Sequence, residues 1–170
     1  MDLRAAIRDV PDFPVKGILF RDITPLLGQA DALKEVVDRL AALFRGDRIG
    51  RVLGVESRGF LFGAPLAIRL GAGFAPVRKP GKLPSAAIRQ AYKLEYGDAT
   101  LEIHEDAVRP GERVLVVDDL IATGGTLEAS VSLARRLKAE VVACAVVIEL
   151  TSLGGRGRLP GLRFESLVKY

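Results

Sequence analysis

A run of residues near the middle of the chain has the types and spacing that phosphate and sugar binding require. Residues 114–117 are apolar and mostly β-branched, and Asp118 and Asp119 follow them directly. Small and hydroxyl-bearing residues come next, at positions 122–126 (Ala-Thr-Gly-Gly-Thr), and apolar residues then recur at helical spacing. The pattern predicts a buried strand, a loop and a helix.

The predicted loop is suited to bind a phosphate group. Gly124 and Gly125 permit a close backbone approach that a Cβ would prevent. The first N–H groups of a helix lack intrahelical partners and lie at the positive end of its dipole, and Thr123 and Thr126 add hydroxyl donors. The two acids would repel a phosphate, so they suit neutral hydroxyls or a group that carries a metal. Together these features predict a ribose 5-phosphate site.

Each half of this run also has an ordinary structural explanation. A Gly-Gly pair after a strand is most often a turn, and an Asp-Asp pair is often a solvated loop or a helix cap. The whole ordered run is more specific, and it resembles the motif by which phosphoribosyltransferases bind 5-phosphoribosyl-1-pyrophosphate (PRPP). The resemblance implies that Asp118 and Asp119 reach the ribose hydroxyls or metal-bound waters. It also implies a 5-phosphate site at Ala122, Thr123, Gly124, Gly125 and Thr126.

A second strand, loop and helix pattern lies earlier in the chain. Residues 51–55 read as a buried strand and residues 60–70 as a helix, which places the cation of Arg58 at a helix start. An isolated surface arginine is the ordinary alternative. The resemblance implies instead that Ser57 and Arg58 bind the pyrophosphate of PRPP. It further implies a non-proline cis peptide near Glu56–Ser57.

Residues 73–77 predict a third strand, and a basic run follows at residues 78–82. A charge run is usually a solvated face. These cations, however, follow a strand end at the same predicted edge of the sheet, where ligands of open α/β sheets bind. We therefore assign three of them to the pyrophosphate: Arg78, Lys79 and Lys82.

The N-terminal segment 13–25 combines prolines and a glycine with a central Ile-Leu-Phe and predicts an irregular, anchored structure. Packing into the core is the ordinary role of apolar and aromatic residues of this kind. The segment also resembles the N-terminal signature of adenine phosphoribosyltransferases, in which it forms a hood over the base. The resemblance implies backbone hydrogen bonds to adenine around Leu19 and Arg21. It implies that Phe20 stacks on the ring and that Leu150 packs on the opposite side.

Residues 83–96 show little periodicity and predict an irregular lid. The end of this stretch, Leu94-Glu-Tyr-Gly97, resembles the end of the flexible catalytic loop in the same family. The resemblance implies that Glu95 is the catalytic acid and base. The residues alone would class Glu95 as an ordinary surface side chain.

Composition limits the class of protein. The chain has 170 residues, of which 49% are hydrophobic and 27% charged, as is usual for one globular domain. It carries a single cysteine, Cys144, in an apolar run, which excludes an intrachain disulfide framework and predicts a buried small hydrophobe. There is no membrane-spanning apolar run and no signal-peptide pattern, so we expect a cytoplasmic protein without a membrane partner.

The formal charge of +4 suits an anionic small molecule. Zinc-finger and RNA-recognition patterns are absent, so we expect no nucleic-acid partner.

Strands and helices alternate along the chain and predict an α/β fold with a mostly parallel sheet flanked by helices. This is the type I phosphoribosyltransferase fold that the resemblance implies. We expect a single domain over residues 1–170, with a small hood formed by residues 1–27 and the C-terminal tail. The remaining predicted elements are helices at 2–10 and 31–44 and strands at 99–103, 140–150 and 163–168.

The resemblance implies a purine-salvage enzyme that transfers ribose 5-phosphate from PRPP to adenine, giving AMP and pyrophosphate. It implies an oxocarbenium-like transition state, a homodimer and a Mg²⁺ ion held mainly by PRPP, without a firm protein ligand. Two alternatives remain. A sister enzyme would use hypoxanthine, guanine or xanthine, and the resemblance of residues 18–21 to the adenine phosphoribosyltransferase signature disfavours it. A regulator that senses PRPP would leave Glu95 without a role and usually carries a DNA-binding domain, for which the chain has no spare length.

Overall fold

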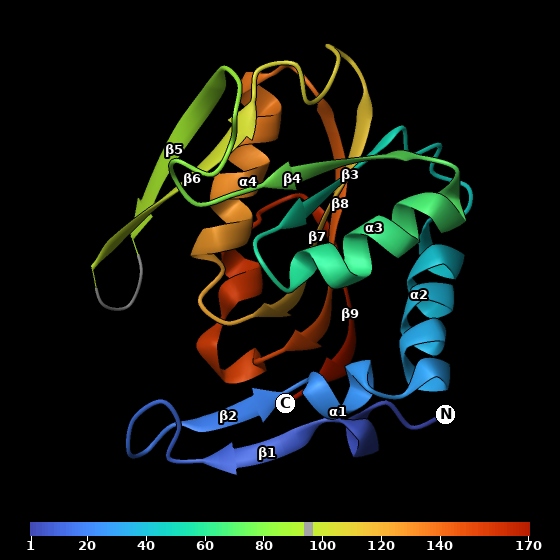
Figure 1. Ribbon diagram of the computed structural model, residues 1–170, viewed down its shortest axis with the longest axis vertical. Coiled ribbons are helices and arrows are strands. Elements are labelled where there is room, and N and C mark those ends of the chain that lie inside the picture. The colour runs from blue at the N-terminus through green and yellow to red at the C-terminus, as the bar shows by residue number, and fades with distance from the viewer. Residues whose placement is uncertain (94–96) are drawn as a thin grey trace.

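The computed structural model describes residues 1–93 and 97–170, and its centre is a parallel sheet covered on both faces (Figure 1). The five strands lie in the order β4-β3-β7-β8-β9. This arrangement confirms the predicted α/β class and the parallel sheet. The strands are β3 (Arg51–Val55), β4 (Gly73–Val77), β7 (Arg113–Ile121), β8 (Glu140–Glu149) and β9 (Arg163–Lys169).

The two faces of the sheet bury different helices because side chains alternate along each strand. Leu115 and Val117 belong to the core shared with α2 and α3, whereas Val114 and Val116 belong to the core shared with α4. Cys144 lies in this second core, where burial raises its thiol pKa to about 12. In residues 1–93 and 97–170 no helix is long and apolar enough to span a membrane. The main helices are α2 (Ala30–Phe44), α3 (Gly59–Leu70) and α4 (Gly125–Arg136).

Strand β7 is longer than the sequence predicted. Its apolar run was expected to end before the two acids, but the strand continues through Asp118 and Asp119 to Ile121. The reason is its neighbour β8, which pairs with β7 as far as Ile121 opposite Glu149. On the other side, the pairing with β3 ends at Val117. The acids therefore lie within a strand that has lost one of its two neighbours.

A hairpin of β5 (Ala87–Lys93) and β6 (Asp98–His104) lies beside α4 (Figure 1). The prediction of an irregular stretch over residues 83–96 was wrong for β5. Its half-buried positions include Ile88, Gln90 and Tyr92, which alternate with exposed residues. Gln90 obscures this alternation in the sequence, because a polar residue occupies one of the half-buried positions. Its side-chain oxygen accepts a hydrogen bond from Ser132 of α4 at 3.0 Å. Residues 94–96, and with them Glu95, lie outside the described residues.

The N-terminal segment forms a second hairpin, which lies below the sheet in Figure 1. The predicted helix over residues 2–10 was wrong, because only a short 3₁₀ turn, η1 (Arg4–Ala6), is present. From Arg8 the chain instead pairs with the strand that begins at Leu19, and Arg8 and Asp22 form a cross-strand ion pair. The elements of this hood are β1 (Arg8–Pro11), β2 (Leu19–Asp22) and the short helix α1 (Thr24–Leu27).

The end of the chain contacts the hood. The guanidinium groups of Arg21 and Arg4 lie over the ring of Tyr170, with Cζ atoms 3.9 and 4.5 Å from the ring centroid. The backbone oxygen of Tyr170 accepts hydrogen bonds from the N–H and the hydroxyl of Thr151, at 2.8 and 2.6 Å. Tyr170 thereby links the hood to the turn that follows β8.

Candidate active site

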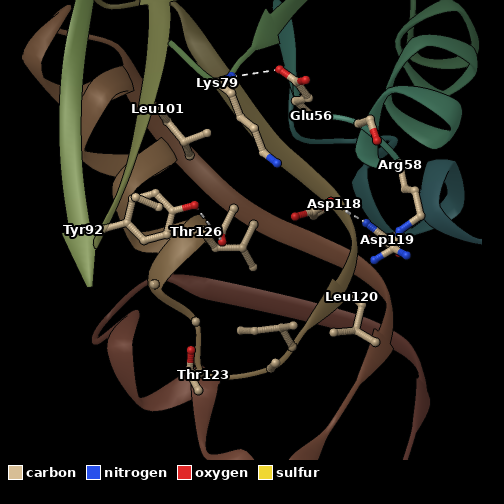
Figure 2. A pocket seen from close by; sticks show the side chains of 17 residues that line it. Glu56, Arg58, Lys79, Tyr92, Leu101, Asp118, Asp119, Leu120, Thr123 and Thr126 are labelled. Carbon is tan, nitrogen blue, oxygen red and sulfur yellow. Dashed lines mark hydrogen bonds and ion pairs between the residues drawn. The ribbon is translucent and has the colours of Figure 1, made fainter. Parts of the chain in front are cut away.

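A cavity of about 540 Å³ opens at the carboxyl ends of β3 and β7 (Figure 2). Such ends are where open α/β sheets bind their ligands. The cavity brings together ten of the predicted site residues, namely Ser57, Arg58, Lys79, Asp118, Asp119, Ala122, Thr123, Gly124, Gly125 and Thr126. The other lining residues are Glu56, Tyr92, Ala99, Leu101, Leu120, Ile121 and Leu127.

The predicted strand, loop and helix are present, and the loop 122–126 comprises the connection from β7 and the first two residues of α4. Gly124 has a left-handed backbone conformation (φ +87°), which is strained for other residues, and α4 begins at Gly125. The first N–H groups of the helix are thus presented at the cavity wall. The Thr126 hydroxyl donates to the Tyr92 hydroxyl oxygen at 3.4 Å, so the hairpin closes this side of the cavity (Figure 2).

The two acids are both buried, and they differ in their partners. Arg58 Nε lies 2.6 Å from Asp119 Oδ2. Asp118 Oδ1 accepts the backbone N–H of Asp119 at 2.8 Å. Burial raises the pKa of Asp118 well above its ordinary value, and the neighbouring charge of Asp119 adds to this effect. Figure 2 shows both acids at the cavity, beside the guanidinium of Arg58.

A buried glutamate organises the basic residues. The Glu56 carboxylate accepts the Lys79 N–H at 2.8 Å and lies 2.5 Å from Lys82 Nζ and 3.3 Å from Arg78 Nε. Burial works to raise the pKa of Glu56, but the bonds from Lys82 and the Lys79 N–H outweigh it and lower that pKa. Arg78 and Lys82 are therefore held beside the cavity, whereas the Lys79 side chain extends into it (Figure 2).

Sequence reasoning placed Glu56 in the loop but did not recognise its role, because its partners lie more than twenty positions away. The peptide bond between Glu56 and Ser57 is cis, as predicted. Tyr92 and Leu101 of the hairpin were also missed as lining residues. The alternation of half-buried and exposed positions in β5 was the one sequence signal that could have identified Tyr92 as a residue facing the cavity.

The four residues predicted to bind adenine do not line this cavity. Phe20 lies beside it, since the Arg58 guanidinium carbon is 5.7 Å from its ring centroid. The Arg21 side chain is paired with Asp9. Leu19 is exposed, and the Leu150 N–H donates to the Ile121 carbonyl at 3.0 Å, which places Leu150 beside a lining residue.

Comparisons with known proteins decide the family. The phosphoribosyl transferase domain model matches residues 27–158. The adenine phosphoribosyltransferase of Acaryochloris marina is 56% identical over 170 residues, with full coverage of both chains. The chain belongs to the adenine phosphoribosyltransferase family. Members of this family are pentosyltransferases, and the reaction of the family is the formation of AMP from adenine and PRPP.

Solved adenine phosphoribosyltransferases have the same fold as this chain. The enzyme of Thermoanaerobacter pseudethanolicus has a TM-score of 0.96 at 50% identity, over 99% of this chain and 98% of that chain. The enzyme of Saccharomyces cerevisiae, complexed with D-2,5-dideoxy-2,5-imino-altritol 1,6-bisphosphate and adenine, has a TM-score of 0.92 at 39% identity. That match covers 98% of this chain and 96% of the yeast chain.

The buried charge of Asp118 leads to a stability prediction. The pKa of Asp118 is raised in the folded state. The destabilising effect of its negative charge is therefore absent below the ordinary pKa, and it develops as the pH rises through the folded-state pKa. Asp118→Asn removes the charge but keeps an oxygen acceptor for the Asp119 N–H. We expect this variant to be more stable than the wild type at pH 7.5, by about 1 kcal/mol or ~2–4 °C in Tm.

Thermal unfolding of the unliganded proteins between pH 4 and pH 8 measures this effect, and the gain should shrink toward pH 4. Asp119→Asn is the control, because it removes the ion-pair partner of Arg58 and should give no gain. A Tm of Asp118→Asn equal to or below that of the wild type at pH 7.5 would contradict the assignment of a destabilising charge.

Proposed function

We propose that this chain makes AMP for purine salvage in a Mg²⁺-dependent transfer through an oxocarbenium-like transition state. One observation carries the proposal: a single cavity holds a cationic end, an acid pair and a glycine-rich helix start in that order. PRPP has the complementary order of pyrophosphate, ribose hydroxyls and 5-phosphate. The yeast relative, which was solved with adenine and a bisphosphate, supports the same pairing of ligands.

The 5-phosphate would bind to the loop 122–126, through backbone N–H groups and the hydroxyls of Thr123 and Thr126. Asp118 and Asp119 would accept hydrogen bonds from the ribose hydroxyls. The phosphate contacts are remote from the reacting carbon, so their binding energy orients the sugar for the displacement.

The leaving group would bind at the cationic end. As the bond between C1 of the ribose and pyrophosphate breaks, negative charge collects on the pyrophosphate and positive charge on the sugar. Arg58 and Lys79 stabilise the negative charge on the pyrophosphate, and the carboxylates near the ribose stabilise the positive charge on the sugar. Because Arg58 is paired with Asp119, its guanidinium is already held at the cavity before the pyrophosphate arrives.

The site fits a Mg²⁺ ion that the substrate largely supplies with ligands. Within residues 1–93 and 97–170 no group of three His, Cys, Asp or Glu side chains could hold a metal ion. Two adjacent carboxylates, Asp118 and Asp119, do line the cavity, and Mg²⁺ commonly binds through one or two carboxylates, substrate phosphates and water. When bound, the ion would neutralise charge on the leaving pyrophosphate.

Adenine would bind between the hood and the cavity, with Phe20 on one side and Leu150 on the other. N9 of adenine forms the new bond to C1, and Glu95 takes the proton that adenine loses. Glu95 itself lies outside the described residues, but Tyr92, three positions before it, lines the cavity. The proposed role of Glu95 therefore rests on the resemblance of residues 94–97 to the end of the family's catalytic loop.

The reaction is tested by measuring AMP formation from adenine and PRPP with Mg²⁺, beside reactions with hypoxanthine and guanine. We expect product with adenine alone, and loss of turnover when EDTA removes the metal. Turnover of hypoxanthine or guanine would indicate the sister enzyme. PRPP binding without product from any base would indicate a regulator.

Glu95→Gln should lower kcat by about 10²–10⁴-fold, because an amide cannot accept the adenine proton. The KM for PRPP should stay near the wild-type value, because the contacts to the phosphates are intact. Steady-state kinetics with each substrate varied measures both quantities. Glu105→Gln, which changes an exposed carboxylate beyond β6, is the control and should be fully active. An unchanged kcat in Glu95→Gln would remove this residue from the chemistry.

We also propose that the chain is a homodimer. The support is a pair of large apolar side chains on α3, Leu61 and Ile68, which are 46% and 82% exposed and lie seven residues apart on one helix face. Sedimentation velocity should show a dimer for the wild type and a monomer for Ile68→Asp. A dimer that persists in Ile68→Asp would exclude this face, and a monomeric wild type would exclude the dimer.

A further inference from the structure

The turn that follows β8 packs directly against the loop 122–126. Gly155 is buried there at the start of a 3₁₀ helix, η3 (Gly155–Arg158). A Cβ on Gly155 would overlap the Ala122 carbonyl oxygen and lie 2.9 Å from Gly124 N. A Cβ on Gly124 would in turn lie 3.0 Å from the Gly155 carbonyl carbon. The contact is made by backbone on both sides, so no side chain can move to relieve it.

An ion pair between the buried Glu149 and the largely exposed Arg156 lies at this turn. Glu149, the last residue of β8, accepts two hydrogen bonds from Arg156, from Nε to Oε1 at 3.0 Å and from Nη2 to Oε2 at 2.8 Å. The Ser166 hydroxyl of β9 donates to Glu149 Oε2 at 2.5 Å. Arg156 also donates to the Phe164 carbonyl at 3.3 Å. The residue after Gly155 is thus tied to two strands, in a two-point geometry that sets orientation as well as distance.

The charge of Glu149 persists at neutral pH. The hydrogen bonds from Arg156, followed by the bond from Ser166, lower the pKa of its carboxyl group. Ile121, the last residue of β7, pairs with Glu149 across the sheet. The loop and the turn therefore leave the sheet from neighbouring strand ends, and the ion pair joins the end of β8 to the turn.

We propose that Gly155 and the Glu149–Arg156 pair are positioning residues for PRPP, because they set the backbone of the 5-phosphate loop. The inference rests on the proposed function, in that it takes the loop 122–126 as the 5-phosphate site. It adds a structural support that none of the predicted site residues provides. Substitution of Gly155 or Arg156 should weaken ligands that carry the 5-phosphate much more than it weakens adenine.

Gly155→Ala tests the contact itself. The added methyl group should displace the loop and raise the KM for PRPP and the Kd for AMP about 10- to 100-fold, with a much smaller change in the KM for adenine. Gly157→Ala is the matched control, since a Cβ there meets nothing within 4 Å. Steady-state kinetics and calorimetry with AMP and ribose 5-phosphate measure these values. A general loss of structure would instead lower Tm and weaken both substrates together.

The ion pair is tested by a second series. Arg156→Ala should show the same selective defect for PRPP and AMP, and Arg156→Lys should recover part of it by retaining a charge beside Glu149. Arg158→Ala is the control, because Arg158 forms an exposed ion pair with Glu128 at 3.0 Å. Wild-type values for PRPP in both Gly155→Ala and Arg156→Ala, or equal losses for adenine, would overturn the proposal.

Thr126→Val distinguishes failure of this inference from failure of the loop assignment. If Thr126→Val weakens ribose 5-phosphate binding while Gly155→Ala does not, the loop binds phosphate and the proposed support is wrong. If ribose 5-phosphate binds equally to the wild type and to all the variants, the loop is not the phosphate site and both proposals fail.

Discussion

The site depends on the unequal pairing of β7 with its two neighbours. On one side, β8 stays paired with β7 to Ile121, and on the other the pairing with β3 stops at Val117. Beyond that point the chain from β3 turns away through Glu56 into α3, and the space it leaves is part of the cavity. Asp118 and Asp119 are consequently held by a regular strand on one side and face an open site on the other.

This arrangement has an electrostatic cost that the fold offsets with cations. Buried carboxylates lose hydration worth several kcal/mol per ion unless partners compensate. Arg58 compensates Asp119, and the basic residues 78–82 compensate Glu56. The same pairs hold the cations in place before any ligand binds, so little reorganisation is needed when an anionic group arrives. Of these acids Asp118 is the least stabilised by nearby cations, and its burial therefore raises its pKa.

The sequence was most informative where one stretch of chain contains both the structure and the chemistry. Strands 51–55 and 73–77 were predicted with their observed bounds. The acid pair and the glycine-rich loop were predicted as one site from residue types and spacing, and both line one cavity. Prediction failed where a distant partner decides the outcome. The role of Glu56 depends on contacts across the sheet, and the strand at residues 87–93 depends on a half-buried Gln90 that α4 satisfies. Residues 8–11 form a strand instead of extending a helix because β2 pairs with them.

The residues predicted to contact PRPP and those predicted to contact adenine come from different parts of the fold. The general phosphoribosyl transferase model matches residues 27–158, which include every predicted PRPP contact and exclude the hood and β9. Phe20 and Arg21 lie in the hood, which Tyr170 links to the turn that carries Leu150. Residues predicted to contact adenine are thus supported mainly by the two ends of the chain, and those predicted to contact PRPP by its middle. The two sets meet in the turn after β8, where Leu150 is predicted to contact adenine and Gly155 packs on the loop.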